Sequence, residues 1–239
     1  MATKNVIVDN KNFDISYEIV NPTAKKDIIF LHGWGSNKDI MKNIFSSYLK
    51  DFRHIYIDLP GFGKSLNNYV LTTQDYAKIV DEFLNLISSS KDIIAGHSYG
   101  GKVAVLLNPK NLVMLSSAGI LEEKPFDVKA KIFFAKVFNA LGLRGITKRF
   151  RSKDVNTMSE NMYATFKNVV NEDFSSYFSN FSNNALVFWG EKDTATSLES
   201  GKKMASLLKK STFTSYDGDH YFFAHNAKNI SERIENGIL

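Results

Sequence analysis

Short apolar runs and longer amphipathic segments alternate along most of this chain. The segments Val6 to Val8 and Phe13 to Ile19 have strand character and are predicted to form an opening hairpin. Six further apolar runs have the length of buried strands: Asp27 to Leu31, Arg53 to Ile57, Asp92 to Ala95, Leu112 to Leu115, Leu186 to Trp189 and Thr212 to Tyr216. Apolar positions at helical spacing between them predict helices at Thr73 to Ile87, Val103 to Leu107, Leu198 to Lys209 and Ala227 to Ile238. This alternation predicts an α/β fold with a mostly parallel, eight-stranded sheet flanked by helices.

The alternation stops between Ser117 and Asn184, where no strand pattern is present. Apolar side chains recur there at helical spacing in two groups, around Ile132 to Leu141 and around Tyr163 to Val170. We therefore expect a helical lid inserted into the core, with the core formed by residues 1–118 and 183–239 and the lid by residues 119–182. Aromatic side chains of this insertion either line an acyl pocket or pack the lid itself, and packing is expected for most: Phe133, Phe134, Phe138, Tyr163 and Phe166.

Composition limits the kind of protein this can be. A chain of 239 residues, 44% of them hydrophobic, is long enough for one substantial core, so we expect one domain with an inserted subdomain. The absence of cysteine excludes disulfides and thiolate-bound metals. Residues Met1 to Phe13 contain no apolar run that suits a signal peptide or a membrane span. We therefore expect a soluble, cytoplasmic protein without a membrane partner.

The net charge of +5 is concentrated in one segment. Residues 120–155 hold nine basic side chains, Lys124, Lys129, Lys131, Lys136, Arg144, Lys148, Arg149, Arg151 and Lys153, against the four acidic side chains Glu122, Glu123, Asp127 and Asp154. A basic helical segment is most often a solvated face, and it can also dock an acidic partner such as an acyl carrier protein. The sequence offers no pattern for nucleic-acid binding.

The five residues Gly96-His97-Ser98-Tyr99-Gly100 directly follow a predicted buried strand and precede an apolar, helix-like run. A serine on such a sharp strand-to-helix turn has its hydroxyl exposed and is a candidate nucleophile. Side chains at Gly96 or Gly100 would collide with the neighbouring strand or helix, which explains the two glycines.

The same turn predicts half of an oxyanion hole. The amide of Tyr99 would lie at a helix N-terminus, where the backbone dipole favours developing negative charge. The other half is expected in the loop after the first parallel strand, where Gly33 and Gly35 allow the backbone to turn the amide of Trp34 inward.

Three motifs together resemble those of the α/β-hydrolase superfamily: His32 to Gly35, Asp58 to Ser65 and Gly96 to Gly101. The resemblance spans nearly the whole chain and is greatest to lidded bacterial serine esterases and carbon-carbon bond hydrolases. It implies an active site at the carboxyl ends of the parallel strands. The Asp58 to Ser65 segment lacks the spacing of a phosphate-binding loop and is interpreted as a family turn bordering that site.

A serine hydroxyl needs a histidine to take its proton and an acid to orient that histidine. Only His220 and His225 follow Ser98 in the chain, and His220 stands in a segment that resembles the family's Gly-His loop. His225 is expected to begin the closing helix. Asp193 ends a Trp-Gly-x-x-Asp string that resembles the family's acid motif, and the fallback acids are Glu191 and Asp219.

The chain departs from the family pattern in two places. Thr196 and Ser197 stand where relatives often carry a proline, and Asn108-Pro109 ends the helix after the nucleophile early. Both changes leave the catalytic groups in place. The remaining motif histidines, His32 and His97, are expected to pack and hydrogen-bond within their loops.

These residues predict a serine hydrolase that uses Ser98, His220 and Asp193, without a cofactor or a metal site, on a small-to-medium acyl substrate. Carboxylic-ester hydrolysis is the leading interpretation. Carbon-carbon hydrolysis of a vinylogous diketone uses the same triad and stays open, as does a carrier-protein methyl esterase. A binding module on the same fold is the non-enzymatic alternative.

Overall fold

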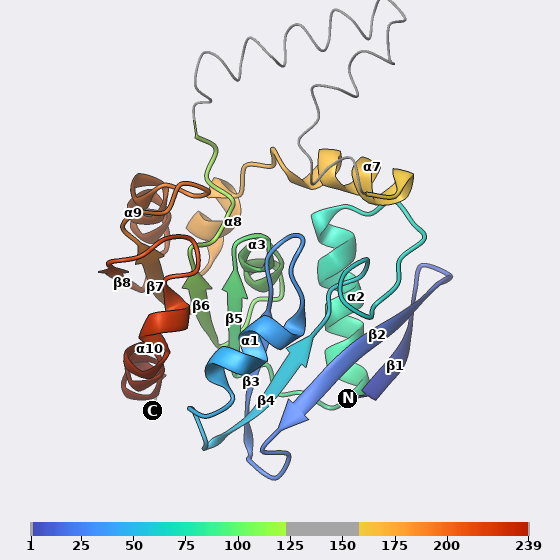
Figure 1. Cartoon of the computed structure of the whole chain (residues 1–239), viewed down its shortest axis with the longest axis horizontal. Coiled ribbons are helices and arrows are strands. Elements are labelled where there is room, and N and C mark those ends of the chain that lie inside the picture. The colour runs from blue at the N-terminus through green and yellow to red at the C-terminus, as the bar shows by residue number, and fades with distance from the viewer. Residues whose placement is uncertain (1, 123–157, 239) are drawn as a thin grey trace, which may run out of the picture.

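The computed structural model describes residues 2–122 and 158–238, and these form one eight-stranded sheet in the order β1-β2-β4-β3-β5-β6-β7-β8 (Figure 1). The strands are β1 (Ala2–Val8), β2 (Lys11–Val20), β3 (Lys26–Leu31), β4 (Phe52–Ile57), β5 (Ile93–His97), β6 (Asn111–Leu115), β7 (Asn184–Gly190) and β8 (Ser211–Tyr216). Pairing is antiparallel between β1 and β2 and between β2 and β4, and parallel from β4 to β8. The predicted hairpin and mostly parallel sheet are confirmed.

Alternate residues of the central strands face opposite sides of the sheet, because side chains point up and down in turn along a strand. On β3, Ile29 and Leu31 belong to one core cluster, whereas Ile28 and Phe30 belong to another. Both clusters are large, so the sheet is buried on its two faces, as parallel sheets usually are.

Helices cover both faces. The larger cluster includes side chains of α2 (Thr73–Leu86), α3 (Tyr99–Leu106), α8 (Ser175–Asn180) and α9 (Leu198–Leu207), and the smaller one includes side chains of α1 (Lys38–Phe45) and α10 (Phe223–Ile238). Sequence periodicity did not predict α1. Its eight residues make only about two turns, and its buried side chains include the cation of Lys38 beside Met41 and Phe45.

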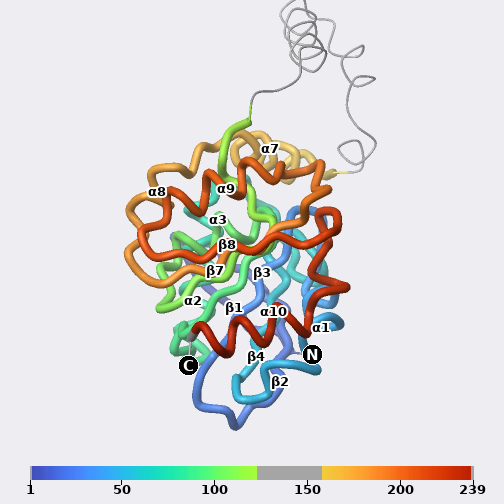
Figure 2. The backbone as a smooth tube through the Cα atoms, turned by 90° about the vertical axis from the view of Figure 1, so that its left-hand side faces the viewer, coloured from blue at the N-terminus to red at the C-terminus, as the bar shows by residue number. Residues whose placement is uncertain are grey.

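The interval between β6 and β7 contains α7 (Glu160–Val169), close to the predicted helix at Tyr163 to Val170. In Figure 1, α7 lies above α2, at the end of the molecule toward which the arrowheads of β5 and β6 point, and in the view of Figure 2 it again lies at the top of the coloured chain. Its side chains bond the loop before α2, where Thr165 Oγ1 accepts from the amide of Leu71 at 3.0 Å. The helix predicted at Ile132 to Leu141 lies outside the described residues.

Candidate active site

Ser98 occupies the turn between β5 and α3, with φ 50° and ψ −118°. A positive φ is strained for a residue with a side chain and persists only where the surrounding structure enforces it. A Cβ atom at Gly96 would lie 2.5 Å from Gly101 Cα, and one at Gly100 would overlap the carbonyl of Leu31. The two glycines therefore allow the strand and helix to approach closely enough to impose the turn.

The loop that carries Trp34 is held beside Ser98 by His32. His32 Nε2 accepts from the amide of Leu59 at 3.0 Å, so its proton lies on Nδ1, which donates to Gly33 O at 2.8 Å. Burial lowers the pKa of His32 to about 4, which keeps the ring neutral.

The amide of Ser36 also donates to Gly33 O, at 3.2 Å. Because a trans peptide is planar, fixing this carbonyl makes the amide of Trp34 point the opposite way. A Cβ at Gly33 would lie 3.1 Å from Ser98 Cβ, so the Gly33–Trp34 peptide is next to the serine. The geometry suits the predicted oxyanion donor.

His220 and Asp193 meet across two loops at the carboxyl ends of β8 and β7. His220 Nδ1 lies 2.7 Å from Asp193 Oδ2, and the Asp193 side chain has no exposed surface, whereas that of His220 is 18% exposed. A carboxylate here accepts a hydrogen bond from Nδ1–H and leaves Nε2 free to act as a base. The alternative acids take other partners: Glu191 accepts from Ser215, and Asp219 from the amide of Tyr221.

Asp193 accepts three further hydrogen bonds from the loop that follows it. Its Oδ1 accepts from the amides of Ala195 and Thr196 at 2.8 and 3.0 Å, and its Oδ2 accepts from Thr196 Oγ1 at 2.9 Å. Burial alone would raise the pKa of Asp193, but the bonds from His220 and Thr196 outweigh it and lower the pKa to about 2. Asp193 is therefore ionised at neutral pH.

His97 joins the two halves of the site. Its Nε2 donates to the backbone carbonyl of His220 at 3.0 Å, and the two ring centroids are 4.6 Å apart. Burial, reinforced by nearby His220, lowers the pKa of His97 to about 3, so the donor is a neutral ring. The residue before Ser98 thus ties the loop of His220 to the turn of Ser98, a contact between loops that the sequence interpretation did not include.

A cavity of about 180 Å³ opens beside Ser98. Its walls come from the turn and α3, the Trp34 loop, the loop after β6, and α7 with the residue that follows it: Trp34, Ser98, Tyr99, Lys102, Ala118, Phe166, Val169 and Val170. The rings of Phe166 and Trp34 are 5.4 Å apart, so this aromatic residue of α7 lines the cavity as well as packing. Lys102 and Ala118 were not singled out from the sequence, although Lys102 follows Ser98 by one helical turn.

The segment Asp58 to Ser65 stabilises the site through the bonds of Asp58. Asp58 accepts from the amide and Nζ of Lys38, both at 2.8 Å, and from the amide of Lys64 at 3.0 Å. This ion pair is buried and links the start of α1, which follows the Trp34 loop, to the turn after β4. The Asp58 carboxylate is thus engaged in bonds within the protein. Among the described residues, no group of His, Cys, Asp and Glu side chains has the arrangement of a metal site.

The model of the alpha/beta hydrolase family matches residues 28–229. The chain belongs to this family. The match confirms the resemblance seen in the motifs.

Individual relatives of this α/β hydrolase include the pimeloyl-[acyl-carrier protein] methyl ester esterase of Pseudoalteromonas atlantica, 34% identical over 92 residues. That match covers 37% of this chain and 35% of the esterase, so it spans about a third of the relative's length. The uncharacterized hydrolase YugF of Bacillus subtilis is 24% identical over 263 residues, which cover 97% of this chain and 96% of that protein. The solved structure of an esterase from Exiguobacterium antarcticum has a TM-score of 0.77 at 18% identity, covers 99% of each chain, and shows that the fold is shared.

The departure at Thr196 has a structural consequence in this α/β hydrolase. The amide and the hydroxyl of Thr196 both donate to Asp193, and a proline at this position would supply neither bond. Ser197 caps α9, where its hydroxyl accepts from the amide of Ser200 at 3.1 Å. Thr196 and Ser197 therefore bond directly to the acid and to the start of α9. Within the described residues, no helix is long and apolar enough to cross a membrane.

Proposed function

We propose that this α/β hydrolase is a serine esterase that cleaves carboxylic esters of small-to-medium acyl groups through an acyl-enzyme on Ser98. The main support for this proposal is the hydrogen bond between His220 and Asp193. The loop of His220 is bonded to His97, which directly precedes Ser98 in its strained turn. This arrangement matches the roles of a nucleophile, a base and an orienting acid.

In the first half-reaction, Ser98 Oγ attacks the ester carbonyl carbon while His220 Nε2 takes the hydroxyl proton. The carbonyl electron pair moves to the oxygen, and the amides of Trp34 and Tyr99 stabilise this oxyanion. Collapse of the tetrahedral intermediate breaks the bond to the alcohol oxygen, which receives the proton from His220.

In the second half-reaction, water attacks the acyl-serine and gives a proton to His220. The new tetrahedral intermediate expels Ser98 Oγ, which regains its proton from His220, and the carboxylic acid leaves. Asp193 stays ionised throughout and stabilises the protonated imidazole. His32 and His97 remain neutral and hold the Trp34 amide and the His220 loop.

The test is intact-mass analysis after treatment with a fluorophosphonate probe, run on the parent, Ser98→Ala and His220→Ala proteins. We expect one adduct on the parent, none on Ser98→Ala and slow labelling of His220→Ala. His225→Ala is the matched control, because His225 lies in the first turn of α10 and is expected to label at the parental rate. A folded parent that forms no adduct would contradict the proposal and favour the binding-module alternative.

An esterase acting on a carrier-bound methyl ester is the second candidate. The 34% identity to the Pseudoalteromonas atlantica esterase and the basic segment 120–155 support it, although most of that segment lies outside the described residues. A salt-sensitive preference for carrier-bound over free methyl esters is the expected result, and equal rates would remove this candidate. Including a vinylogous diketone in the substrate panel tests carbon-carbon hydrolysis.

We further propose that α7 is part of a lid spanning residues 119–182, and that the protein acts in the cytoplasm. The position of α7 over the Ser98 cavity supports the first proposal, and the absence of cysteine supports the second. Cell fractionation tests the location.

A further inference from the structure

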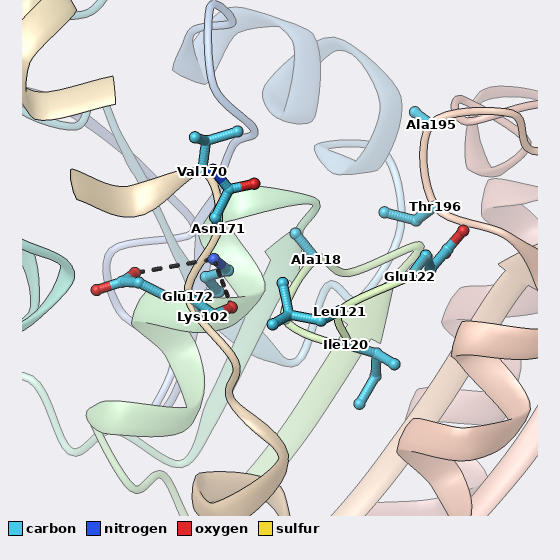
Figure 3. A pocket seen from close by; sticks show the side chains of 11 residues that line it. Lys102, Ala118, Ile120, Leu121, Glu122, Val170, Asn171, Glu172, Ala195 and Thr196 are labelled. Carbon is cyan, nitrogen blue, oxygen red and sulfur yellow. Dashed lines mark hydrogen bonds and ion pairs between the residues drawn. The ribbon is translucent and has the colours of Figure 1, made fainter. Parts of the chain in front are cut away.

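Figure 3 shows a second cavity, which has a volume of about 310 Å³. It lies between the loop after β6 and the segment after α7, and its walls are formed by Lys102, Ala118, Gly119, Ile120, Leu121, Glu122, Val170, Asn171, Glu172, Ala195 and Thr196. Lys102, Ala118 and Val170 also line the Ser98 cavity. The two cavities therefore share part of their walls.

One wall of the second cavity lies next to Ser98. The amide of Ala118 donates to Ser98 O at 3.0 Å, so the shared wall begins at the serine itself. The leaving alcohol must receive its proton from His220 and therefore lies next to that ring. His220 is not among the described residues that line either cavity, which favours the acyl half of the ester over the alcohol as the occupant.

The charged groups in the wall already have partners within the protein. Lys102 Nζ donates to Val169 O at 2.7 Å and to Glu172 O at 3.4 Å, and lies 3.8 Å from Glu172 Oε2. Glu172 also accepts from Thr73 Oγ1, and Glu122 Oε1 accepts from the amide of Ser197 at 2.8 Å. One cation and two carboxylates leave a negative balance, which disfavours an anionic substrate group.

The rest of the wall is mostly aliphatic, from Ala118, Ile120, Leu121, Val170 and Ala195. Leu121 and Val170 project from opposite sides of the cavity, and they are 50% and 44% exposed (Figure 3). Covering such surface with an apolar chain is favourable by about 25 cal/mol per Å². These aliphatic side chains suit an apolar ligand, and the polar side chains beside them, Lys102, Glu122, Glu172 and Thr196, are bonded to other groups of the protein.

We propose that the second cavity binds the distal part of an uncharged aliphatic acyl chain, and that Val170 sets the length of chain that passes from Ser98. This inference rests on the proposed function, because it requires that Ser98 be acylated. It assigns medium-chain, uncharged acyl esters as the preferred substrate class.

The first test compares kcat/KM for the p-nitrophenyl esters of acetate and octanoate in the parent, Val170→Trp and Val70→Trp proteins. Indole at position 170 should block the passage and lower the octanoate-to-acetate ratio at least tenfold. Val70→Trp is the matched control, because Val70 is similarly exposed, at 49%, and lines neither cavity. Its ratio should stay within twofold of the parent. A parental ratio in Val170→Trp would overturn the proposal.

Leu121→Trp fills the second cavity from the opposite wall and should lower the same ratio without altering the segment after α7. Thermal denaturation of each variant separates blocked passage from misfolding. If both folded tryptophan variants leave the ratio at the parental value, the second cavity does not hold the acyl chain.

Two further substrate series test which half of the ester enters the second cavity and whether the cavity excludes a charged chain end. For ethyl and octyl acetates, the ratio of the two rates should be the same in the parent and Val170→Trp proteins. A selective loss of activity on octyl acetate would place the alcohol in this cavity and overturn the proposal.

The mono-p-nitrophenyl ester of octanedioic acid should react at least tenfold more slowly than the octanoate ester. Glu122→Gln should reduce this difference, and an equal rate for the two esters in the parent would contradict the requirement for an uncharged chain.

The two proposals fail in different ways. A parent that hydrolyses no ester and forms no fluorophosphonate adduct contradicts the esterase function, and the cavity assignment falls with it. A parent that hydrolyses esters with a chain-length ratio unaffected by Val170→Trp contradicts only the cavity assignment.

Discussion

The proposed catalytic groups and the cavities that face the substrate are built in different ways. Around the catalytic groups, polar atoms are held by short bonds from rigid backbone: His32 to Gly33, His97 to the His220 carbonyl, and Asp193 to the Thr196 loop. The second cavity is instead bounded by half-exposed aliphatic side chains, Leu121 and Val170.

This difference indicates that the placement of the catalytic groups and the selectivity among esters have separate physical origins. Hydrogen bonds depend steeply on distance and angle, so they can position a proton acceptor to within a fraction of an ångström. Aliphatic contacts depend mainly on area and shape, so they tolerate substitution and select by size. Changes at the catalytic groups should therefore alter kcat for every ester, whereas changes in the second cavity should alter the ranking of esters.

The largest effect is expected for His220→Ala. Loss of the base should lower kcat by roughly 10⁴- to 10⁶-fold for all esters, in line with other serine triads. Steady-state kinetics with p-nitrophenyl acetate and octanoate measure this loss. A reduction that differs strongly between the two esters would break the proposed separation of placement from selectivity.

Asp193→Asn should lower kcat by about 10⁴-fold while leaving the fold intact. The neutral amide can donate to Nδ1 and no longer fixes the proton there, so His220 loses its favoured tautomer. Stopped-flow or discontinuous assays at pH 7.5 measure the rate. Glu191→Gln is the control, because Glu191 contacts Ser215 on the exposed side and should retain parental activity.

The free energy of unfolding should fall as the pH drops below about 6.5. In the unfolded chain, His32 and His97 then bind protons, whereas their buried rings in the folded protein stay neutral. With folded pKa values of about 4 and about 3, both rings stay neutral where unfolded histidine is charged, and each costs about 2–3 kcal/mol of unfolding free energy by pH 4.5.

Asp193 acts at lower pH. Its folded pKa of about 2 lies below the unfolded value, so its contribution to the free energy of unfolding is present above pH 4 and is lost as the pH falls through 2.

Urea unfolding at pH 7.5 and 4.5 measures the effect of the two buried histidines. His97→Gln should lose a smaller amount of stability over this interval than the parent, and equal losses would contradict the assignment to buried histidine.

A smaller effect is expected when His97 is changed to phenylalanine. The aromatic ring is kept but the Nε2 donor is removed, so the His220 carbonyl loses its partner and kcat should fall by about tenfold, which corresponds to about 1.4 kcal/mol. His97→Gln retains an amide donor and should recover most of the rate with KM unchanged. If both variants lose the same rate, the ring packing and not the hydrogen bond positions His220.

The smallest effect is expected for Thr196→Val, which removes the hydroxyl bond to Asp193 Oδ2 but keeps the backbone bond to Oδ1. The loss of one of four bonds should reduce kcat by about threefold to tenfold, or about 1 kcal/mol. Kinetics with the acetate ester measure it, and Thr194→Val is the neighbouring control, because Thr194 is exposed. A parental rate in Thr196→Val would show that the backbone amides alone hold Asp193.

Much of the fold was predictable because its determinants are local. Strand-length apolar runs and helical spacing predicted the eight strands and most of the helices, including α7 near Tyr163 to Val170. Helix α1 escaped prediction because its burial depends on an ion pair between Lys38 and Asp58, which are far apart in the sequence. No periodicity of apolar residues records such a contact.

The candidate site divides in the same way. The sequence by itself determined the strained turn at Ser98 and the order of serine, acid and histidine, since glycine spacing and chain order are properties of the string. The motif resemblance predicted Asp193 ahead of Glu191, and the structure places Asp193 in contact with His220. Only the tertiary structure decided that His97 holds the His220 loop and that Val170 borders two cavities. These contacts join segments that are distant along the chain, and their directions are set by how the loops at the ends of the strands pack together.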